Sequence, residues 1–228
     1  MLYTYDGNNA NMFLNSGKKF ATIGDSIANR GWWQEYVCAL TNMTYTNYSA
    51  GGTAITKINT SDSDYFGARV PNMANDFDVI IVWGGVNDFL LNAELGEMGD
   101  TTNGTFYGAV NNLCEALISK YKEAKIGFCT TTPIASLATQ QAQNLPFGGG
   151  DQPNTKGYYL SQYMDAIKEV CAEHSIPVLD LYKESGFNQQ NIDVMTSYKN
   201  ETGPDGLHPS HKGFKLIANK SAMFIGNL

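Results

Sequence analysis

Positive charge is scarce in this chain: 15 Lys and Arg residues stand against 22 Asp and Glu, which gives a formal net charge of -7. Non-specific binding to nucleic acid or to an anionic membrane needs a basic surface, so this balance argues against both functions. No apolar run approaches the ~20 residues that a membrane-spanning helix requires. The first residues also lack the charged-then-apolar pattern of a signal peptide. We therefore expect a soluble protein with no nucleic-acid partner and no membrane insertion.

Several motifs of common enzyme classes are missing as well. There is no G-x-S-x-G, which disfavours the ordinary α/β-hydrolase arrangement, no glycine-rich phosphate loop and no H-E-x-x-H zinc motif. The four cysteines form no C-x-x-C pair and lie in apolar segments. We expect them to be buried free thiols, with one or two disulfides as the alternative. They are Cys38, Cys114, Cys129 and Cys171.

The hydrophobic pattern alternates between strand-like and helix-like segments about five times. With 228 residues, 43% of them hydrophobic, the chain can form one core, and we expect one domain over residues 18–228 after a polar N-terminal extension of residues 1–17. Alternation of this kind predicts an α/β fold, with a parallel sheet of about five strands covered by helices on both faces. The strands are expected at 18–24, 43–49, 78–85, 125–133 and 176–182, and the helices at 30–40, 105–124, 158–174 and 211–225. The apolar run at 78–85 should be the most buried strand.

Residues that could take part in catalysis follow these predicted strands. Ser26 stands after the first strand, immediately ahead of a helix, and two glycines, Gly51 and Gly52, follow the second. Asn87 follows the third strand, and Asp205 and His208 come about two dozen residues after the last. In parallel sheets, ligands bind at the carboxyl ends of the strands, so these residues are expected at one edge.

Together they are the components of acyl transfer by a serine nucleophile. Ser26 needs a neighbouring base, and His208 is the one histidine with an acid, Asp205, three residues before it. Asp205 would orient one ring nitrogen and leave the other facing Ser26. The backbone N–H of Ser26, at a helix N-terminus, the N–H of Gly51 and the amide of Asn87 would stabilise the oxyanion. Gly52 remains an alternative to Gly51 at this position.

The same residues resemble the four motifs of the SGNH (GDSL-type) hydrolase family. They stand here as Gly24-Asp25-Ser26, Gly51, Gly85-Val86-Asn87-Asp88 and Asp205-Gly206-Leu207-His208, in the family's order. Ser49 departs from the family's second motif, where a glycine is usual. The resemblance, over residues 18–228, implies a flavodoxin-like three-layer fold, no cofactor or metal, and hydrolysis of esters. The esters would be acetyl esters on carbohydrates, or small acyl and lipid esters.

Other interpretations of these residues remain open. Asp25 and Ser26 are also typical helix-capping residues. His211 lies three residues after His208, so Asp205, His208 and His211 could ligate a metal, although we expect His211 on the surface of the last helix. A non-catalytic carbohydrate-binding module on the same fold, and a lysophospholipase- or thioesterase-type lipid hydrolase, are further alternatives.

The remaining expectations concern the substrate and its surroundings. Segment 137–153, with three consecutive glycines, is long for a connection and is expected to cover the site. Its lack of a long apolar run favours a short acyl group, with an O-acetylated polysaccharide as first choice. Trp33 and Tyr36 are expected in the core, whereas Trp32 could contact a sugar. The Asn- and Thr-rich texture suits a module of a larger surface or phage-tail protein, in an extracellular or virion-associated rather than cytoplasmic location.

Overall fold

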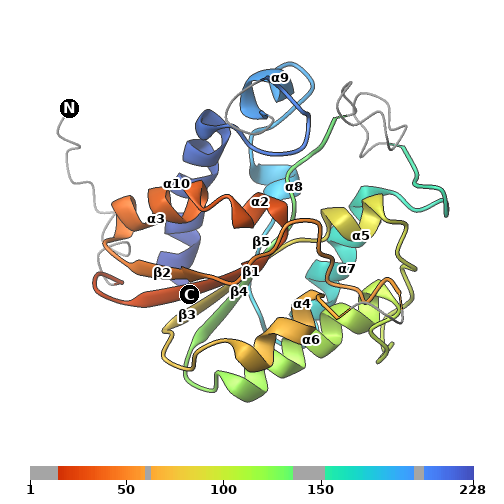
Figure 1. Ribbon diagram of the computed structural model, residues 1–228, viewed down its shortest axis with the longest axis horizontal. Helices are drawn as coiled ribbons and strands as arrows, with labels where there is room; N and C mark the ends of the chain where they lie inside the picture. The colour runs from red at the N-terminus through yellow and green to blue at the C-terminus, as the bar shows by residue number, and fades with distance from the viewer. Residues whose placement is uncertain (1–14, 60–62, 136–151, 198–202) are drawn as a thin grey trace.

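Five parallel strands form a central sheet in the order β2-β1-β3-β4-β5 (Figure 1). The structure is a computed structural model that describes residues 15–59, 63–135, 152–197 and 203–228. The strands are β1 (Lys19–Gly24), β2 (Thr44–Asn47), β3 (Val79–Trp83), β4 (Lys125–Cys129) and β5 (Val178–Leu179). The predicted parallel sheet of about five strands is confirmed, and its order is that of flavodoxin-like sheets.

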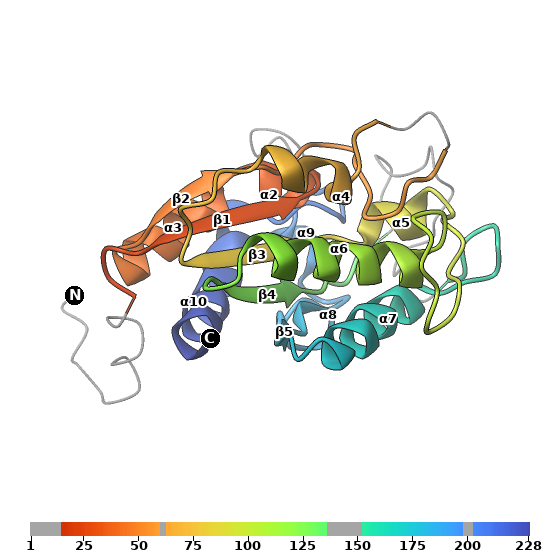
Figure 2. The same cartoon turned by 90° about the horizontal axis from the view of Figure 1, so that it is seen from below.

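Helices cover both faces of the sheet, which gives the expected three-layer α/β/α arrangement. Helices α3 and α10 pack together on one face, and α4, α6 and α7 lie on the other (Figures 1 and 2). The longer helices are α3 (Trp32–Thr41), α6 (Phe106–Lys120), α7 (Leu160–Glu173) and α10 (His211–Asn227). The short ones are α2 (Ser26–Asn29), α4 (Phe66–Arg69), η2 (Val70–Asn72), α5 (Val86–Leu90), α8 (Leu181–Glu184) and α9 (Ile192–Met195).

The strand order reverses between β1 and β3. In open parallel sheets, ligands bind beyond the carboxyl ends of the strands at such a reversal. The two strands end level with each other, because Gly24 pairs with Trp83 in their register. The residues that follow them, Ser26 and Asn87, therefore leave the sheet at the same edge. Strand β3 is buried along its whole length, as the sequence predicts. Such a rigid central strand is a good base for a site that has to hold its geometry.

Two element boundaries differ from the sequence pattern. Strand β5 has two residues, not seven, because the Asp180 side chain accepts a hydrogen bond from the Lys183 N–H and begins α8. The helix that Ser26 begins is a single turn of four residues, separated from α3 by Gly31, whose φ of 82° lies in the left-handed region. One turn has little macrodipole, so any stabilisation of an oxyanion at Ser26 comes from individual N–H groups.

The cysteines and aromatic residues of the predicted core can now be placed. All four cysteines are free thiols, three buried and Cys38 half-buried. Trp33 is fully buried and donates from Nε1 to Ser221 Oγ at 2.9 Å, whereas Tyr36 is half-buried at the edge of the core. Among the described residues, no helix is both long enough and apolar enough to cross a bilayer.

Two predicted segments lie partly outside the described residues. Residues 1–14 of the expected N-terminal extension are among them, while Asn15 is buried and donates from Nδ2 to Ile225 O at 3.1 Å. Of segment 137–153, only residues 152 and 153 are described, so its expected place over the site is not addressed by the structure.

Candidate active site

The structure brings Ser26, His208 and Asp205 together in one chain of hydrogen bonds. His208 Nε2 lies 2.9 Å from Ser26 Oγ, and His208 Nδ1 lies 2.7 Å from Asp205 Oδ2. Ser26 is the first residue of α2, directly after β1, and the other two residues lie in the loop before α10, with His208 182 positions away in the sequence. Asp205 is fully buried, whereas the His208 side chain is 17% exposed. The acid is therefore shielded from solvent, and the histidine is accessible to it.

The turn at residues 205–208 explains why the acid and the histidine meet. Asp205 Oδ1 accepts the N–H groups of Leu207 at 2.9 Å and His208 at 2.8 Å, so the carboxylate folds the turn around itself. Gly206 adopts a φ of 70°, a conformation that favours glycine. The second oxygen of Asp205 is then left to bind the imidazole. The three-residue spacing and the glycine therefore account for the local contact between the acid and the histidine.

A neighbouring segment that sequence reasoning missed holds the turn in place. Buried Thr196 accepts the Gly206 N–H on its Oγ1 at 3.1 Å, and Ser197 donates from its N–H to His208 O at 2.8 Å. Arg30 donates to the carbonyls of Ser197 and Pro209, at 3.0 and 3.4 Å. No motif marks Thr196 or Arg30 in the sequence, because both act through contacts that only the fold creates.

Gly51 is the glycine that faces Ser26. A Cβ placed on Gly51 would lie 3.8 Å from Ser26 Cβ, whereas one on Gly52 would meet nothing within 4 Å. Gly52 has a φ of 77° and shapes the turn. Of the two alternatives that the sequence leaves open, the geometry favours Gly51 as the residue next to the serine.

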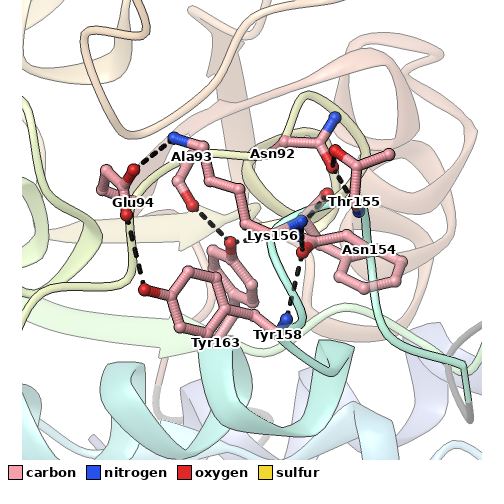
Figure 3. A network of polar contacts seen from close by, with 9 residues as sticks. Asn92, Ala93, Glu94, Asn154, Thr155, Lys156, Tyr158 and Tyr163 are labelled. Carbon is pink, nitrogen blue, oxygen red and sulfur yellow. Dashed lines mark hydrogen bonds and ion pairs between the residues drawn. The ribbon is translucent and has the colours of Figure 1, made fainter.

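Asn87 lies in the same region, at the start of α5. Its Nδ2 donates to Thr53 O at 2.8 Å, which uses one of the two amide hydrogens and anchors the side chain to the loop of Gly51. Near the carboxyl end of α5, Asn154 donates to Phe89 O at 3.1 Å. Tyr163 donates to Ala93 O at 2.5 Å, in the segment that follows α5 (Figure 3). Helix α5 is thus fixed at both ends.

Two buried carboxyl groups, those of Asp25 and Asp88, are next to Ser26 and Asn87 in the sequence. Asp25 caps α2 by accepting the Ile27 N–H at 2.8 Å, as the capping interpretation expects, and it is 1% exposed. Burial raises its pKa to about 7, with Asp88 adding to the rise and the Arg69 charge opposing it. Asp88 accepts the N–H groups of Ile55 and Thr56, and burial raises its pKa as well. Burial thus favours the protonated form of both carboxyl groups, and Asp25 titrates near neutral pH.

A dependence of stability on pH is expected from Asp25. Its pKa in the folded protein, about 7, lies above the ordinary value of 3.8. Between about pH 4 and 7, the folded state therefore keeps a proton that the unfolded chain has already released. The free energy of unfolding should fall as pH rises through that window, by on the order of 3 kcal/mol from this group. Urea unfolding of wild type and Asp25→Asn at pH 5 and pH 8 measures it. The free energy of unfolding of the variant, relative to that of wild type, should be higher at pH 8 than at pH 5. The same difference between the two proteins at both pH values would contradict the assignment.

His211 takes no part in this arrangement. It is exposed on the first turn of α10, as predicted, where its ring stacks on Trp32 with centroids 3.6 Å apart and its Nδ1 lies 2.8 Å from Tyr36 Oη. Both ring nitrogens of His208 are engaged by Ser26 and Asp205. Within the described parts of the chain, no three potential ligand residues cluster as a metal site would require. The third histidine, His174, ends α7 and pairs with Asn111.

A cavity of about 270 Å³ opens beside Gly51. Its wall mixes backbone and polar side chains with a few apolar ones. It is lined by Gly51, Gly52, Thr53, Ala54, Thr56, Ile58, Asn59, Asp64 and Leu91. Ser26, Asn87, Asp205 and His208 do not themselves line this cavity. It adjoins them through its loop, because Gly51 lies next to Ser26 and Thr53 O accepts the Asn87 amide.

The chain belongs to the GDSL-like lipase/acylhydrolase family, whose model matches residues 22–216. This match includes Ser26, Gly51, Asn87, Asp205 and His208. It defines the protein as a carboxylic ester hydrolase of the GDSL type, and the resemblance seen in the sequence is confirmed. A comparison with curated proteins gives no match.

Three solved structures share the fold over nearly their full length. A protein from Lactobacillus plantarum is 29% identical with a TM-score of 0.78, over 93% of this chain and 98% of its own. A possible lipase from Chitinophaga pinensis is 22% identical with a TM-score of 0.71, over 90% of this chain and 96% of its own. A carbohydrate acetylesterase family member from Sinorhizobium meliloti is 14% identical with a TM-score of 0.59, over 92% of this chain and all of its own.

Proposed function

We propose that this hydrolase cleaves short-chain carboxylic esters through an acyl-enzyme on Ser26, with acetyl groups on a carbohydrate as its substrate. The observation that carries the proposal is the continuous hydrogen-bond chain from Ser26 Oγ through His208 to Asp205. Because Asp205 is an acceptor, it holds the His208 proton on Nδ1. The lone pair on Nε2 then faces the serine hydroxyl, as a general base must.

The proposed reaction has two matched halves. Ser26 Oγ attacks the ester carbonyl carbon while His208 Nε2 takes the serine proton. The tetrahedral intermediate collapses as His208 gives that proton to the leaving alcohol oxygen, which leaves the acyl group on Ser26. A water molecule then attacks the acyl carbonyl, His208 takes the water proton and returns it to Ser26, and the acid leaves. Asp205 stabilises the imidazolium in both halves.

Three donors are proposed to stabilise the oxyanion: the N–H groups of Ser26 and Gly51 and the side-chain amide of Asn87. The arrangement supports this role, since Gly51 faces Ser26 and the Asn87 amide is fixed by Thr53 O. A fixed donor costs no reorganisation when the negative charge develops on the carbonyl oxygen.

Asn87→Ala is therefore expected to lower kcat by about 10²–10³-fold, with KM changed by less than about threefold, because the donor acts on the tetrahedral state more than on the bound ester. Steady-state kinetics with p-nitrophenyl acetate measure both constants. A loss confined to KM would assign Asn87 to substrate binding instead.

The cavity beside Gly51 supports a short acyl group and a polar alcohol. Its volume of about 270 Å³ lies below the usual ~300–1,000 Å³ range of small-molecule sites. Thr53 and Asn59 offer hydrogen-bonding groups suited to sugar hydroxyls, whereas Ile58 and Leu91 provide only a small apolar surface. The fold is shared with the Sinorhizobium carbohydrate acetylesterase family member, which is consistent with this substrate class.

A lipid acyl hydrolase is the second candidate, favoured by the structural likeness to a possible lipase. Lipid substrates call for a contiguous apolar surface. The large exposed apolar side chains among the described residues are instead spread over different elements, and Leu91 alone borders the cavity. They are Leu91, Met98, Ile118, Tyr159, Val194 and Met223.

Hydrolysis of p-nitrophenyl acetate, butyrate and octanoate, followed by acetate release from an acetylated xylan, tests the proposal. We expect kcat/KM to fall from acetate to octanoate, EDTA to have no effect, and the xylan to release acetate. A preference for octanoate would overturn the substrate class in favour of the lipid hydrolase. No turnover on any ester would overturn the reaction itself.

A further inference from the structure

Arg69, the last residue of α4, sends a largely buried guanidinium toward the serine edge of the sheet. Its side chain is 14% exposed. Nη1 donates to the backbone carbonyls of Gly24 and Tyr48, both at 2.9 Å, and Nη2 donates to Thr53 Oγ1. Nε pairs with Asp64 Oδ1 at 2.7 Å, which fixes the rotation of the group. All three nitrogens of the guanidinium are thus engaged.

Three of the four acceptors of Arg69, all except Asp64, lie on the segments that carry the proposed oxyanion donors. Gly24 ends β1, two residues before Ser26, and also accepts the Ala50 N–H at 3.0 Å. The other two acceptors lie on either side of Gly51 in the loop after β2. Thr53 in turn accepts the Asn87 amide on its carbonyl oxygen. One guanidinium therefore connects, directly or through Thr53, the segments of all three donors.

A guanidinium suits this task better than an ammonium. It is planar and always charged, and its five N–H groups point in fixed directions, so it can bind several carbonyls and hydroxyls at once. Charge-assisted hydrogen bonds of this kind are roughly twice as strong as neutral ones. The Arg69 side chain also lies over the Phe66 ring, 5.0 Å from its centroid, which further limits its motion.

We propose that Arg69 is a positioning residue for the oxyanion hole, holding the segments of Ser26, Gly51 and Asn87 at their catalytic separation. The inference rests on the proposed esterase function and adds to it a residue that lies in none of the four family motifs. Arg69 acts through these donors and does not contact the ester. Its loss should therefore weaken binding of the tetrahedral state far more than binding of the substrate.

Lys120 provides a matched control on the same face of the sheet. Its Nζ donates to the carbonyls of Val70, Pro71 and Met73, at 2.8, 2.9 and 2.6 Å. It resembles Arg69 in being a cation that binds several backbone carbonyls. Its acceptors belong to the segment after α4 and not to the strand ends at the serine. Lys120→Met should thus reproduce the loss of a multiply bonded cation without disturbing the proposed oxyanion hole.

The test compares Arg69→Gln, Arg69→Lys and Lys120→Met with wild type, after Ser26-dependent turnover of p-nitrophenyl acetate has been established. If wild type shows no such turnover, the proposed function fails, and this inference fails with it for that separate reason. If it does, Arg69→Gln should lower kcat/KM by about 10²-fold with KM within about threefold of wild type. Arg69→Lys should have a kcat/KM at most about tenfold higher than that of Arg69→Gln. Lys120→Met should keep kcat/KM within about threefold of wild type, with the concentration of folded protein determined by circular dichroism.

Binding of an alkylboronic acid provides the deciding readout, because its adduct with Ser26 places a boron-bound oxygen in the oxyanion hole. Its Kd should rise in Arg69→Gln by about the same factor as kcat/KM falls. If Arg69→Gln does not fold, Thr53→Val replaces it. This isosteric change removes the hydroxyl that accepts from Arg69 and donates to Ala50 O in the same loop, and it should lower kcat by about tenfold. Unchanged boronate affinity, or a loss in Lys120→Met as large as that in Arg69→Gln, would overturn the inference.

Discussion

Replacing His208 by alanine is expected to lower kcat for p-nitrophenyl acetate by about 10⁴–10⁶-fold. His208 Nε2 is 2.9 Å from Ser26 Oγ, and it is the base to which we assign the serine proton. Without it the hydroxyl stays protonated at neutral pH and is a poor nucleophile. The residual rate would come from substrate binding and the oxyanion donors. Stopped-flow and overnight assays together cover the necessary range of rates.

His211→Ala is the matched control. His211 lies three residues after His208, at the start of α10, but it contacts Tyr36 and Trp32. It should keep kcat within about threefold of wild type. The double variant Ser26→Ala/His208→Ala should be no slower than either single variant, because residues that act as one unit are not additive. A His208→Ala enzyme with a tenth or more of the wild-type kcat would contradict the assigned role.

Asp205→Asn is expected to lower kcat by about 10⁴-fold through a change of tautomer. Asp205 Oδ1 accepts two backbone N–H groups, from Leu207 and His208, so the asparagine oxygen has to remain on that side. The amide nitrogen is then forced toward His208 Nδ1, where it donates. The imidazole proton moves to Nε2, and the nitrogen facing Ser26 can no longer accept a proton.

Nitrogen-15 NMR of labelled histidine measures this directly. In wild type the Nδ1 signal should be that of a protonated nitrogen, and in Asp205→Asn the protonated signal should belong to Nε2. Far-ultraviolet circular dichroism should be the same for both proteins, because the volume and the backbone bonds of residue 205 are retained. Loss of activity with an unchanged tautomer would show that Asp205 acts in some other way.

The sheet and the proximity of the candidate site residues could be predicted because both follow from local patterns. Buried parallel strands appear as short apolar runs, and their carboxyl ends meet at one edge. Ser26 and Asn87 each stand a few residues beyond such a run, so their proximity follows from topology alone. The turn of Asp205 and His208 is also local, since the carboxylate binds N–H groups two and three residues ahead.

The features that could not be predicted depend on contacts between distant segments. Arg69 lies in a four-residue helix without a recognisable pattern, and its acceptors at the serine edge, Gly24, Tyr48 and Thr53, are 16 to 45 residues away in the sequence. Thr196 supports the histidine turn by accepting the N–H of Gly206, ten residues further along the chain. The choice of Gly51 over Gly52 needs the direction in which each backbone faces Ser26. Asp180 shortens β5 because a helix cap competes with the strand pattern at that residue.

The central claim is that Ser26 is the nucleophile activated by His208. Treatment with a fluorophosphonate, followed by mass spectrometry of the digested protein, tests it most directly. We predict one phosphonyl group per chain on Ser26, loss of esterase activity in proportion to labelling, and labelling slowed by at least about 10³-fold in His208→Ala. Turnover of acetate esters that survives complete labelling, or a label on any residue other than Ser26, would contradict the account.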